Sequence, residues 1–223
     1  MKEYIVFSLS QNKKLARELA TKLGAKLGRI SVTRFADGEV LVKTLSNVKG
    51  KTAIVIESTY KNAHERIFEL LLLLDSINRS GAQSIQLFIP YFGYSRQERV
   101  SWTNEPVSCE VVSKIIETAN YDSLTTFDLH HPVIESFFKR TINSVSTSDI
   151  FIEYYLNYMK YNNLAKRDIV IVSPDHGANH RADSLVGTIG ETKVILDKVR
   201  PKANVAEHLV VGDELVKGKF ALL

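Results

Sequence analysis

The sequence contains a single cysteine, Cys109, so no internal disulfide can form and the chain fits a reducing compartment. It also lacks a long hydrophobic run. The longest aliphatic stretch is the five leucines at 70–74, which is too short to cross a membrane. The apolar part of the first ten residues is too short for a signal peptide. We therefore expect a cytoplasmic protein with no membrane partner.

Dense basic tracts and low-complexity segments are absent as well. The net charge of +4 and the pI near 9.0 come from scattered lysine and arginine residues, which suit an anionic ligand better than a nucleic acid. We expect no nucleic-acid partner. The 44% apolar and 24% charged residues are ordinary for a globular protein, and 223 residues suffice for one large or two small domains.

Strand-like and helix-like segments alternate along the chain. The apolar pattern predicts strands at 4–9, 52–58, 84–90, 123–129, 142–145, 169–172, 193–196, 209–211 and 220–223, with helices near 11–23, 63–77, 107–119 and 178–186. A further helix, capped by residues 146–149, is expected to run to about residue 161. Two further strands, 30–35 and 40–45, flank Asp37-Gly38 and predict a hairpin. This alternation is typical of parallel sheets covered on both sides. Because it restarts near residue 146, we expect two α/β domains, 1–146 and 147–223.

Three basic or amide side chains follow the predicted strand 84–90. Pro90 and Gly93 end that strand, and Arg96, Gln97 and Arg99 come next. In open α/β sheets ligands bind beyond the carboxyl ends of strands, and arginine side chains suit phosphate oxygens. The segment therefore predicts a phosphate or nucleotide loop, with a solvated basic turn as the alternative.

Carboxylate and imidazole groups follow two other predicted strands. Asp128, His130 and His131 come after strand 123–129, and together they suit a divalent or phosphate-bound ion. Asp175 begins a glycine-containing turn after strand 169–172, where it would hold Mg²⁺ against a polyphosphate. The alternatives are a histidine satisfied by a backbone carbonyl and an aspartate that only caps a helix.

Lys198 and Arg200 belong to a predicted charged loop, 197–207. Two cations on a mobile loop would close over a phosphoryl chain and stabilise charge that develops during transfer. A solvated loop without a catalytic role is the alternative.

Taken together, these stretches resemble ribose-phosphate pyrophosphokinases over nearly the whole chain. The resemblance rests on Arg34-Phe-Ala-Asp-Gly-Glu39, Glu69-Leu-Leu with Asp75, Ile89-Pro-Tyr-Phe-Gly-Tyr-Ser-Arg-Gln-Glu-Arg99, Asp128-Leu-His130, Phe137-Phe138, Ser173-Pro-Asp175, Asp197-Lys198 with Arg200, and Val211-Gly-Asp213. It implies an α/β fold of two phosphoribosyltransferase-like domains with mainly parallel sheets, the second domain being incomplete here. It also implies an active site between the domains, near a subunit interface of a homo-oligomer, either a dimer or a hexamer.

The implied reaction transfers the diphosphoryl group of ATP to ribose 5-phosphate, with Mg²⁺, and gives phosphoribosyl pyrophosphate and AMP. By resemblance, a hairpin carrying Phe35, Asp37 and Glu39 receives adenine from a neighbouring subunit. Arg96 and Gln97 match ATP-binding positions, and Arg99 stands beside them. His130 and Asp175 match Mg²⁺-linked positions, and Lys198 and Arg200 match a catalytic flexible loop.

The sequence departs from the family pattern in several places. It stops before the loop that cradles the 5-phosphate of ribose, so we expect ATP or AMP binding with little turnover by this chain alone. Val133 and Ser136 replace the family's glutamine and glycine. Ala178 replaces a glycine, which would be costly if the turn needs a positive φ.

Two other functions are compatible with the residues. One is a non-catalytic homologue that assembles with a full-length synthetase and regulates it. The other is a metal-dependent hydrolase built on His130, His131, Asp175, His176 and His180.

Overall fold

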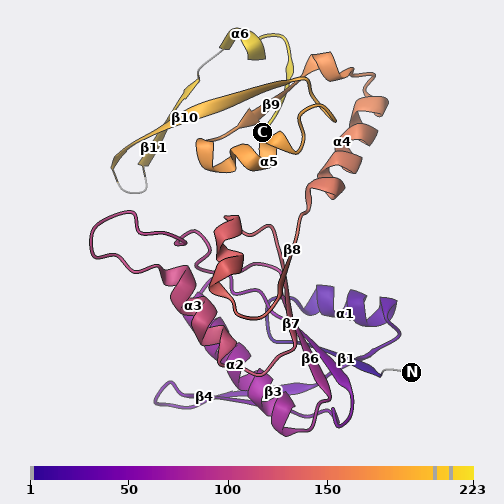
Figure 1. The fold of residues 1–223 in the computed structure, drawn as a ribbon. Coiled ribbons are helices and arrows are strands. Elements are labelled where there is room, and N and C mark those ends of the chain that lie inside the picture. The colour runs from indigo at the N-terminus through magenta and orange to yellow at the C-terminus, as the bar shows by residue number, and fades with distance from the viewer. Residues whose placement is uncertain (1–2, 203–204, 211–212) are drawn as a thin grey trace. The chain divides into compact units, whose positions relative to one another are not determined.

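The computed structural model describes residues 3–202, 205–210 and 213–223 (Figure 1). The chain divides into two compact units, Met1–Val145 and Ser146–Leu223. This division falls one residue from the domain boundary that the sequence predicts.

The first unit is built on a six-stranded parallel sheet with the strand order β2-β1-β5-β6-β7-β8. Its strands are β1 (Tyr4–Ser8), β2 (Lys26–Leu27), β5 (Thr52–Ile56), β6 (Ser84–Ile89), β7 (Ser123–Phe127) and β8 (Ile142–Val145). Five of the six were predicted, each within two residues at either end. The two-residue strand β2 was not, because so short a segment carries no periodic signal.

Helices cover both faces of this sheet, as the alternation predicted. Helices α2 (Ala63–Arg79) and α3 (Ser108–Glu117) bury apolar side chains against one face, to which β1 contributes Ile5 and Phe7. Helix α1 (Lys13–Lys22) buries Ala16 and Ala20 against the other face, to which β1 contributes Val6. Alternate residues of one strand thus serve two cores, which is why its sequence is apolar throughout.

A separate two-stranded hairpin leaves the sheet of the first unit. Strands β3 (Ile30–Arg34) and β4 (Val40–Thr44) pair antiparallel, and the turn between them contains Gly38 with φ of +92°. The predicted hairpin is therefore confirmed. Val42 is buried in the core below α2, and the backbone N–H of Thr44 donates to Ser76 Oγ at 3.0 Å. The base of the hairpin is thus fixed to α2, while its tip projects beyond the helix (Figure 1).

The second unit has a four-stranded sheet with the order β11-β10-β9-β12. Its strands are β9 (Ile169–Ser173), β10 (Thr192–Lys202), β11 (Val205–Val210) and β12 (Phe220–Leu222), and its helices are α4 (Ser148–Tyr161), α5 (Asn179–Asp183) and α6 (Asp213–Val216). Strand β9 pairs parallel with both β10 and β12. Three short 3-10 helices complete the chain: η1 (Pro132–Phe137) in the first unit, and η2 (Lys166–Asp168) and η3 (His176–Ala178) in the second.

Two predictions for the second unit are wrong. Residues 197–207 are not a loop, because most of them belong to β10 and β11, which pair antiparallel from Leu196↔Val210 to Lys202↔Val205. The strand was not predicted because its sequence is charged and contains Pro201. The pairing register shifts between Val199 and Lys202, because proline has no backbone N–H to donate to the neighbouring strand. The predicted helix 178–186 is also too long, since α5 ends at Asp183.

Candidate functional site

The loop after β6 presents Arg96, Gln97 and Arg99 to solvent, as predicted. Its path is set by Gly93, whose backbone N–H donates to the buried Thr59 Oγ1 at 2.6 Å. A Cβ at Gly93 would lie 2.5 Å from the carbonyl oxygen of Thr59, so only glycine fits there. The sequence analysis missed Thr59, although its place at the end of a neighbouring buried strand was a usable signal.

The basic side chains of this loop differ in their charge environment. Arg99 lies 3.6 Å from Glu98, measured from Nε to Oε1, and Glu98 is buried. Arg96 has no ion-pair or hydrogen-bond partner among residues 3–202, 205–210 and 213–223, so its guanidinium is available to an anion.

Burial, with a smaller contribution from Glu98, raises the pKa of Cys109 to about 12, and its thiol is therefore not a nucleophile at neutral pH.

The loop after β7 leaves the same edge of the sheet as the loop after β6. The two strands are parallel neighbours, with Ile89 paired to Thr126. Asp128 is exposed and has a φ of +39°, while His130 is partly buried. His131 has a structural role, because its Nδ1 accepts a hydrogen bond from the backbone N–H of Val133 at 3.1 Å and so caps η1.

The hairpin tip carries Phe35, Asp37 and Glu39, and all three side chains are exposed. Asp37 Oδ1 accepts a hydrogen bond from the backbone N–H of Glu39 at 3.1 Å, which closes a local turn. The ring of Phe35 is 49% exposed. An aromatic ring that its own unit leaves uncovered is available to a ligand or to another chain.

In the second unit Asp175 directly follows β9. Its side-chain Oδ1 accepts from the backbone N–H of Ala178 at 2.9 Å, so the residue caps η3, and it remains partly exposed. Lys198 and Arg200 lie in β10, beyond the pair Ile195↔Ser173, and therefore past the same sheet edge as Asp175. Their side chains lie outside the described part of the structure.

Ala178 fits its turn without strain. Its φ is −87°, so the cost expected for an alanine in place of glycine does not arise. The turn uses ordinary right-handed backbone in η3 instead.

His130 and Asp175 offer one imidazole and one carboxylate as candidate metal ligands. Among the residues that the structure describes, no three histidine, cysteine, aspartate or glutamate side chains gather into a cage. The hydrolase alternative therefore finds no support in the described residues. Mg²⁺ commonly keeps several waters and is held by one or two protein groups together with phosphates, and a single carboxylate such as Asp175 fits that pattern.

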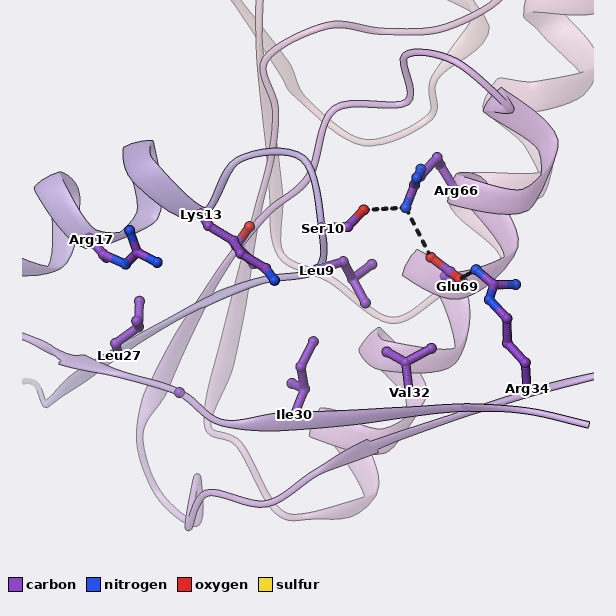
Figure 2. A pocket seen from close by; sticks show the side chains of 12 residues that line it. Leu9, Ser10, Lys13, Arg17, Leu27, Ile30, Val32, Arg34, Arg66 and Glu69 are labelled. Atoms are coloured by element: carbon purple, nitrogen blue, oxygen red, sulfur yellow. Dashed lines mark hydrogen bonds and ion pairs between the residues drawn. The ribbon is translucent and has the colours of Figure 1, made fainter.

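A pocket of about 430 Å³ lies between α1, the β1–α1 loop and β3 of the first unit, and the sequence analysis did not foresee it (Figure 2). Side chains of Leu27, Ile30 and Val32 form one wall. Lys13 and Arg17 lie at one end, and Glu69 with Arg34 and Arg66 lies at the other.

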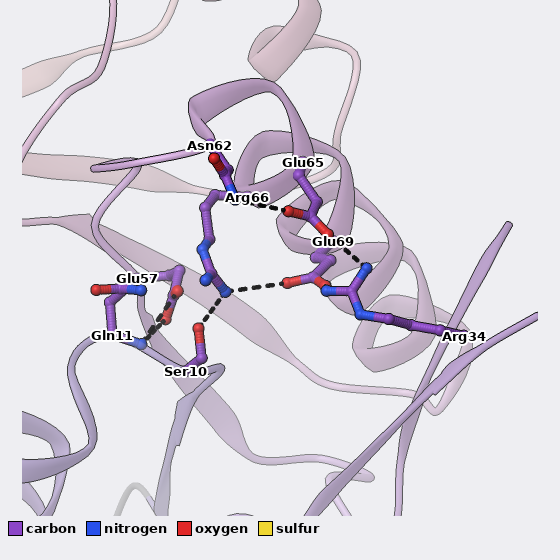
Figure 3. Close-up of polar contacts among 8 residues, drawn as sticks. All are labelled: Ser10, Gln11, Arg34, Glu57, Asn62, Glu65, Arg66 and Glu69. Carbon is purple, nitrogen blue, oxygen red and sulfur yellow. Dashed lines mark hydrogen bonds and ion pairs between the residues drawn. The ribbon is translucent and has the colours of Figure 1, made fainter. Parts of the chain in front are cut away.

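The end of this pocket that contains Glu69 belongs to a charged network (Figure 3). Glu69 is 3% exposed; its Oε1 accepts a hydrogen bond from Arg34, and its Oε2 lies 3.5 Å from Nη1 of Arg66. Arg34 also lies 2.5 Å from Oε1 of Glu65, so β3 is joined to α2 by two carboxylates. Arg66 in turn donates to Ser10 Oγ. The network therefore fixes the strand that leads into Phe35.

Glu57 lies beside this network and is fully buried. The backbone N–H of Gln11 is 3.3 and 3.4 Å from its two carboxylate oxygens. Burial raises the pKa of Glu57 above its ordinary value, although the backbone N–H groups of Gln11 and Ser10 and the charge of Arg66 act in the opposite direction.

Comparison with known proteins places these features in a family. Residues 4–119 match the family model of the N-terminal domain of ribose phosphate pyrophosphokinase. The chain is 38% identical to ribose-phosphate pyrophosphokinase 1 of Lactococcus lactis and 40% identical to the Bacillus subtilis enzyme, each over 219 residues and 98% of this chain. These alignments cover 66% and 67% of the relatives, so the chain spans about two thirds of their length.

The fold matches that of a solved relative as well. The crystal structure of phosphoribosylpyrophosphate synthetase from Mycobacterium smegmatis superposes with a TM-score of 0.85 and 27% identity, covering 99% of this chain and 70% of that one. No helix in the described residues is long and apolar enough to span a bilayer. With the family model, the close sequence relatives and the fold in agreement, the chain belongs to the ribose-phosphate pyrophosphokinase family.

Proposed function

We propose that this chain carries the ATP-binding part of a ribose-phosphate diphosphokinase. In that reaction the 1-hydroxyl oxygen of ribose 5-phosphate forms a bond to the β-phosphorus of ATP, and the bond from that phosphorus to the AMP oxygen breaks. The observation that supports this most directly is the pairing of Ile89 with Thr126, which makes the loops carrying Arg96 and His130 leave one sheet edge. Family membership supplies the reaction type.

The residues of the first unit would bind the nucleotide. Arg96, whose guanidinium has no partner among the described residues, would hold polyphosphate oxygens together with Gln97 and Arg99. The exposed hairpin residues Phe35, Asp37 and Glu39 would receive adenine, the ring by stacking and the carboxylates by hydrogen bonds.

Mg²⁺ bound with the triphosphate would neutralise charge on the transferred group. We assign His130 and Asp175 to its binding because each follows the carboxyl end of a parallel strand. Lys198 and Arg200 are assigned to stabilising charge in the transition state, and their place in a two-stranded antiparallel arm gives them a means of moving together.

The assembly and location are proposals of the same kind. The half-exposed Phe35 at the hairpin tip would be covered further by a second copy of the chain, and this supports a homo-oligomer, a dimer or a hexamer. A mass of about 25 kDa by light scattering would contradict this, because that is the mass of one chain. We propose a cytoplasmic location, as the low cysteine content suggests.

The activity is tested by AMP formation from Mg-ATP and ribose 5-phosphate, with Lys198→Ala as the matched variant. AMP formed by the parent and at least tenfold less by the variant would support the complete activity. ATP binding without AMP formation would restrict this chain to nucleotide binding and would favour the regulatory role beside a full-length synthetase. AMP formed equally by both proteins would contradict the role assigned to Lys198.

A further inference from the structure

The pocket of Figure 2 carries positive charge at one end that no acidic residue of its lining balances. Lys13 and Arg17 are separated by one helical turn on α1, and both side chains point toward the pocket (Figure 2). Neither makes an ion pair or a side-chain hydrogen bond with any residue in the described ranges. At the opposite end Arg34 and Arg66 are matched by Glu65 and Glu69, so the unbalanced charge lies at α1.

The start of α1 adds to this positive potential. The first turn contains two lysines and no acidic residue, although helix N-termini favour negative charge. Asn12, in the capping position, does not cap the helix, because its Oδ1 accepts a hydrogen bond from the backbone N–H of Ser58 at 2.6 Å. The first N–H groups of this ten-residue helix thus lack a side-chain cap, and a bound anion would supply the missing charge.

The two serine hydroxyl groups of the wall do not offer further donors to an anion. Ser8 contributes to the wall, and its hydroxyl oxygen is buried without a hydrogen-bond partner among the described residues. Because protein atoms cover this oxygen, it is not available to a ligand in the pocket. Ser10, also in the wall, has its hydroxyl occupied by Arg66.

The rest of the pocket is apolar. Ile30 and Val32 rise from β3 toward the cavity, and Leu27 lies at the end that holds Arg17 (Figure 2). Val32 is 40% exposed and Leu27 46%, so a ligand with an apolar body would cover surface that now faces solvent. The volume of about 430 Å³ lies within the range of small-molecule sites.

We propose that this pocket binds a small organic phosphate, with the anionic group at Lys13, Arg17 and the start of α1 and an apolar or aromatic group on Val32 and Leu27. The site is separate from the residues assigned to ATP, since neither the hairpin tip nor the loop after β6 contributes to its wall. Its occupant would contact both α1 and β3. Binding would therefore also hold the hairpin that carries Phe35.

The experiment is calorimetric titration of the chain with 1-naphthyl phosphate, beside inorganic phosphate and 1-naphthol as the two halves of the probe. The test variant is Lys13→Ala with Arg17→Ala. Its matched control is Lys14→Ala with Lys22→Ala, which removes the same charge from α1 at positions outside the pocket. Val32→Glu places a carboxylate on the apolar wall, and Arg96→Ala reports binding at the ATP loop.

We expect naphthyl phosphate to bind the parent, the control and Arg96→Ala with equal affinity. Its affinity for the test variant and for Val32→Glu should be lower by about tenfold or more, because the first loses a charge contact and the second adds a repulsive charge. Both half-probes should bind more weakly than the whole. Equal affinity in the test variant, loss of binding in Arg96→Ala, or no saturable binding by the parent would overturn the proposal. If inorganic phosphate bound as tightly as naphthyl phosphate, the role assigned to the apolar wall would be overturned. If 1-naphthol bound as tightly as naphthyl phosphate, the role assigned to Lys13 and Arg17 would be overturned.

Discussion

Arg34 at the end of β3 donates a hydrogen bond to Glu69, a buried carboxylate on α2. Because Phe35 follows Arg34 directly, this contact fixes the strand from which the proposed adenine-binding residues extend. A contact inside one unit thus sets the direction of a hairpin tip whose Phe35 is half exposed.

Replacing Glu69 with alanine should destabilise the first unit. The change leaves Arg66, 16% exposed, without its carboxylate and removes one of two partners of Arg34. Loss of one partner of a largely buried ion pair costs about 3 kcal/mol, whereas loss of a more exposed one costs about 0–1 kcal/mol. We expect Glu69→Ala to lower the free energy of unfolding in urea by the larger amount and Glu65→Ala by the smaller. Equal effects would show that the network does not depend on the buried carboxylate.

The hydroxyl of Thr59 should be required for the loop that carries Arg96. Thr59→Val removes the acceptor of the Gly93 N–H, and a buried donor left without a partner costs about 1–3 kcal/mol. We expect Thr59→Val to weaken ATP binding because the loop loses its anchor, while Thr59→Ser, which keeps the hydroxyl, binds ATP as the parent does. Parent-like ATP affinity in Thr59→Val would show that Gly93 does not position the loop.

Glu57 should make the stability depend on pH. Burial raises the pKa of this carboxyl above 4.5 in the folded chain, so the folded state binds the proton more tightly than the unfolded state. The contribution of Glu57 to stability is therefore fully present below pH 4.5 and falls as the pH rises through the folded pKa. We expect Glu57→Gln to raise Tm relative to the parent at pH 8 and by less at pH 4.5. A Tm difference that does not change with pH would contradict this.

The sequence predicted most of the fold because the central strands β1, β5 and β9 are largely buried on both faces. Continuous apolar runs such as Thr52–Ile56 and the leucine-rich face of α2 need no tertiary information to be recognised. Asp37-Gly38 likewise specifies its turn locally, since Gly38 adopts a positive φ.

The features that were missed depend on contacts between distant segments. Strand β10 continues through Lys198 and Arg200 because β11 pairs with it, although the local sequence is charged. Thr59, 34 residues before Gly93, and the pocket between α1 and β3 arise only when the chain folds. Residue types alone therefore indicated a phosphate ligand, whereas the groups that position the loops could be identified only from the structure.

The central claim is that the edge of the sheet formed by β6 and β7 binds ATP through Arg96. The test is calorimetric titration of Mg-ATP into the parent, Arg96→Ala and Arg79→Ala, because Arg79 is an exposed arginine at the end of α2 that pairs with Asp75. Loss of a charged hydrogen bond to phosphate should weaken binding by about tenfold or more in Arg96→Ala, with Arg79→Ala unchanged. Equal ATP affinity in Arg96→Ala and the parent would contradict the account.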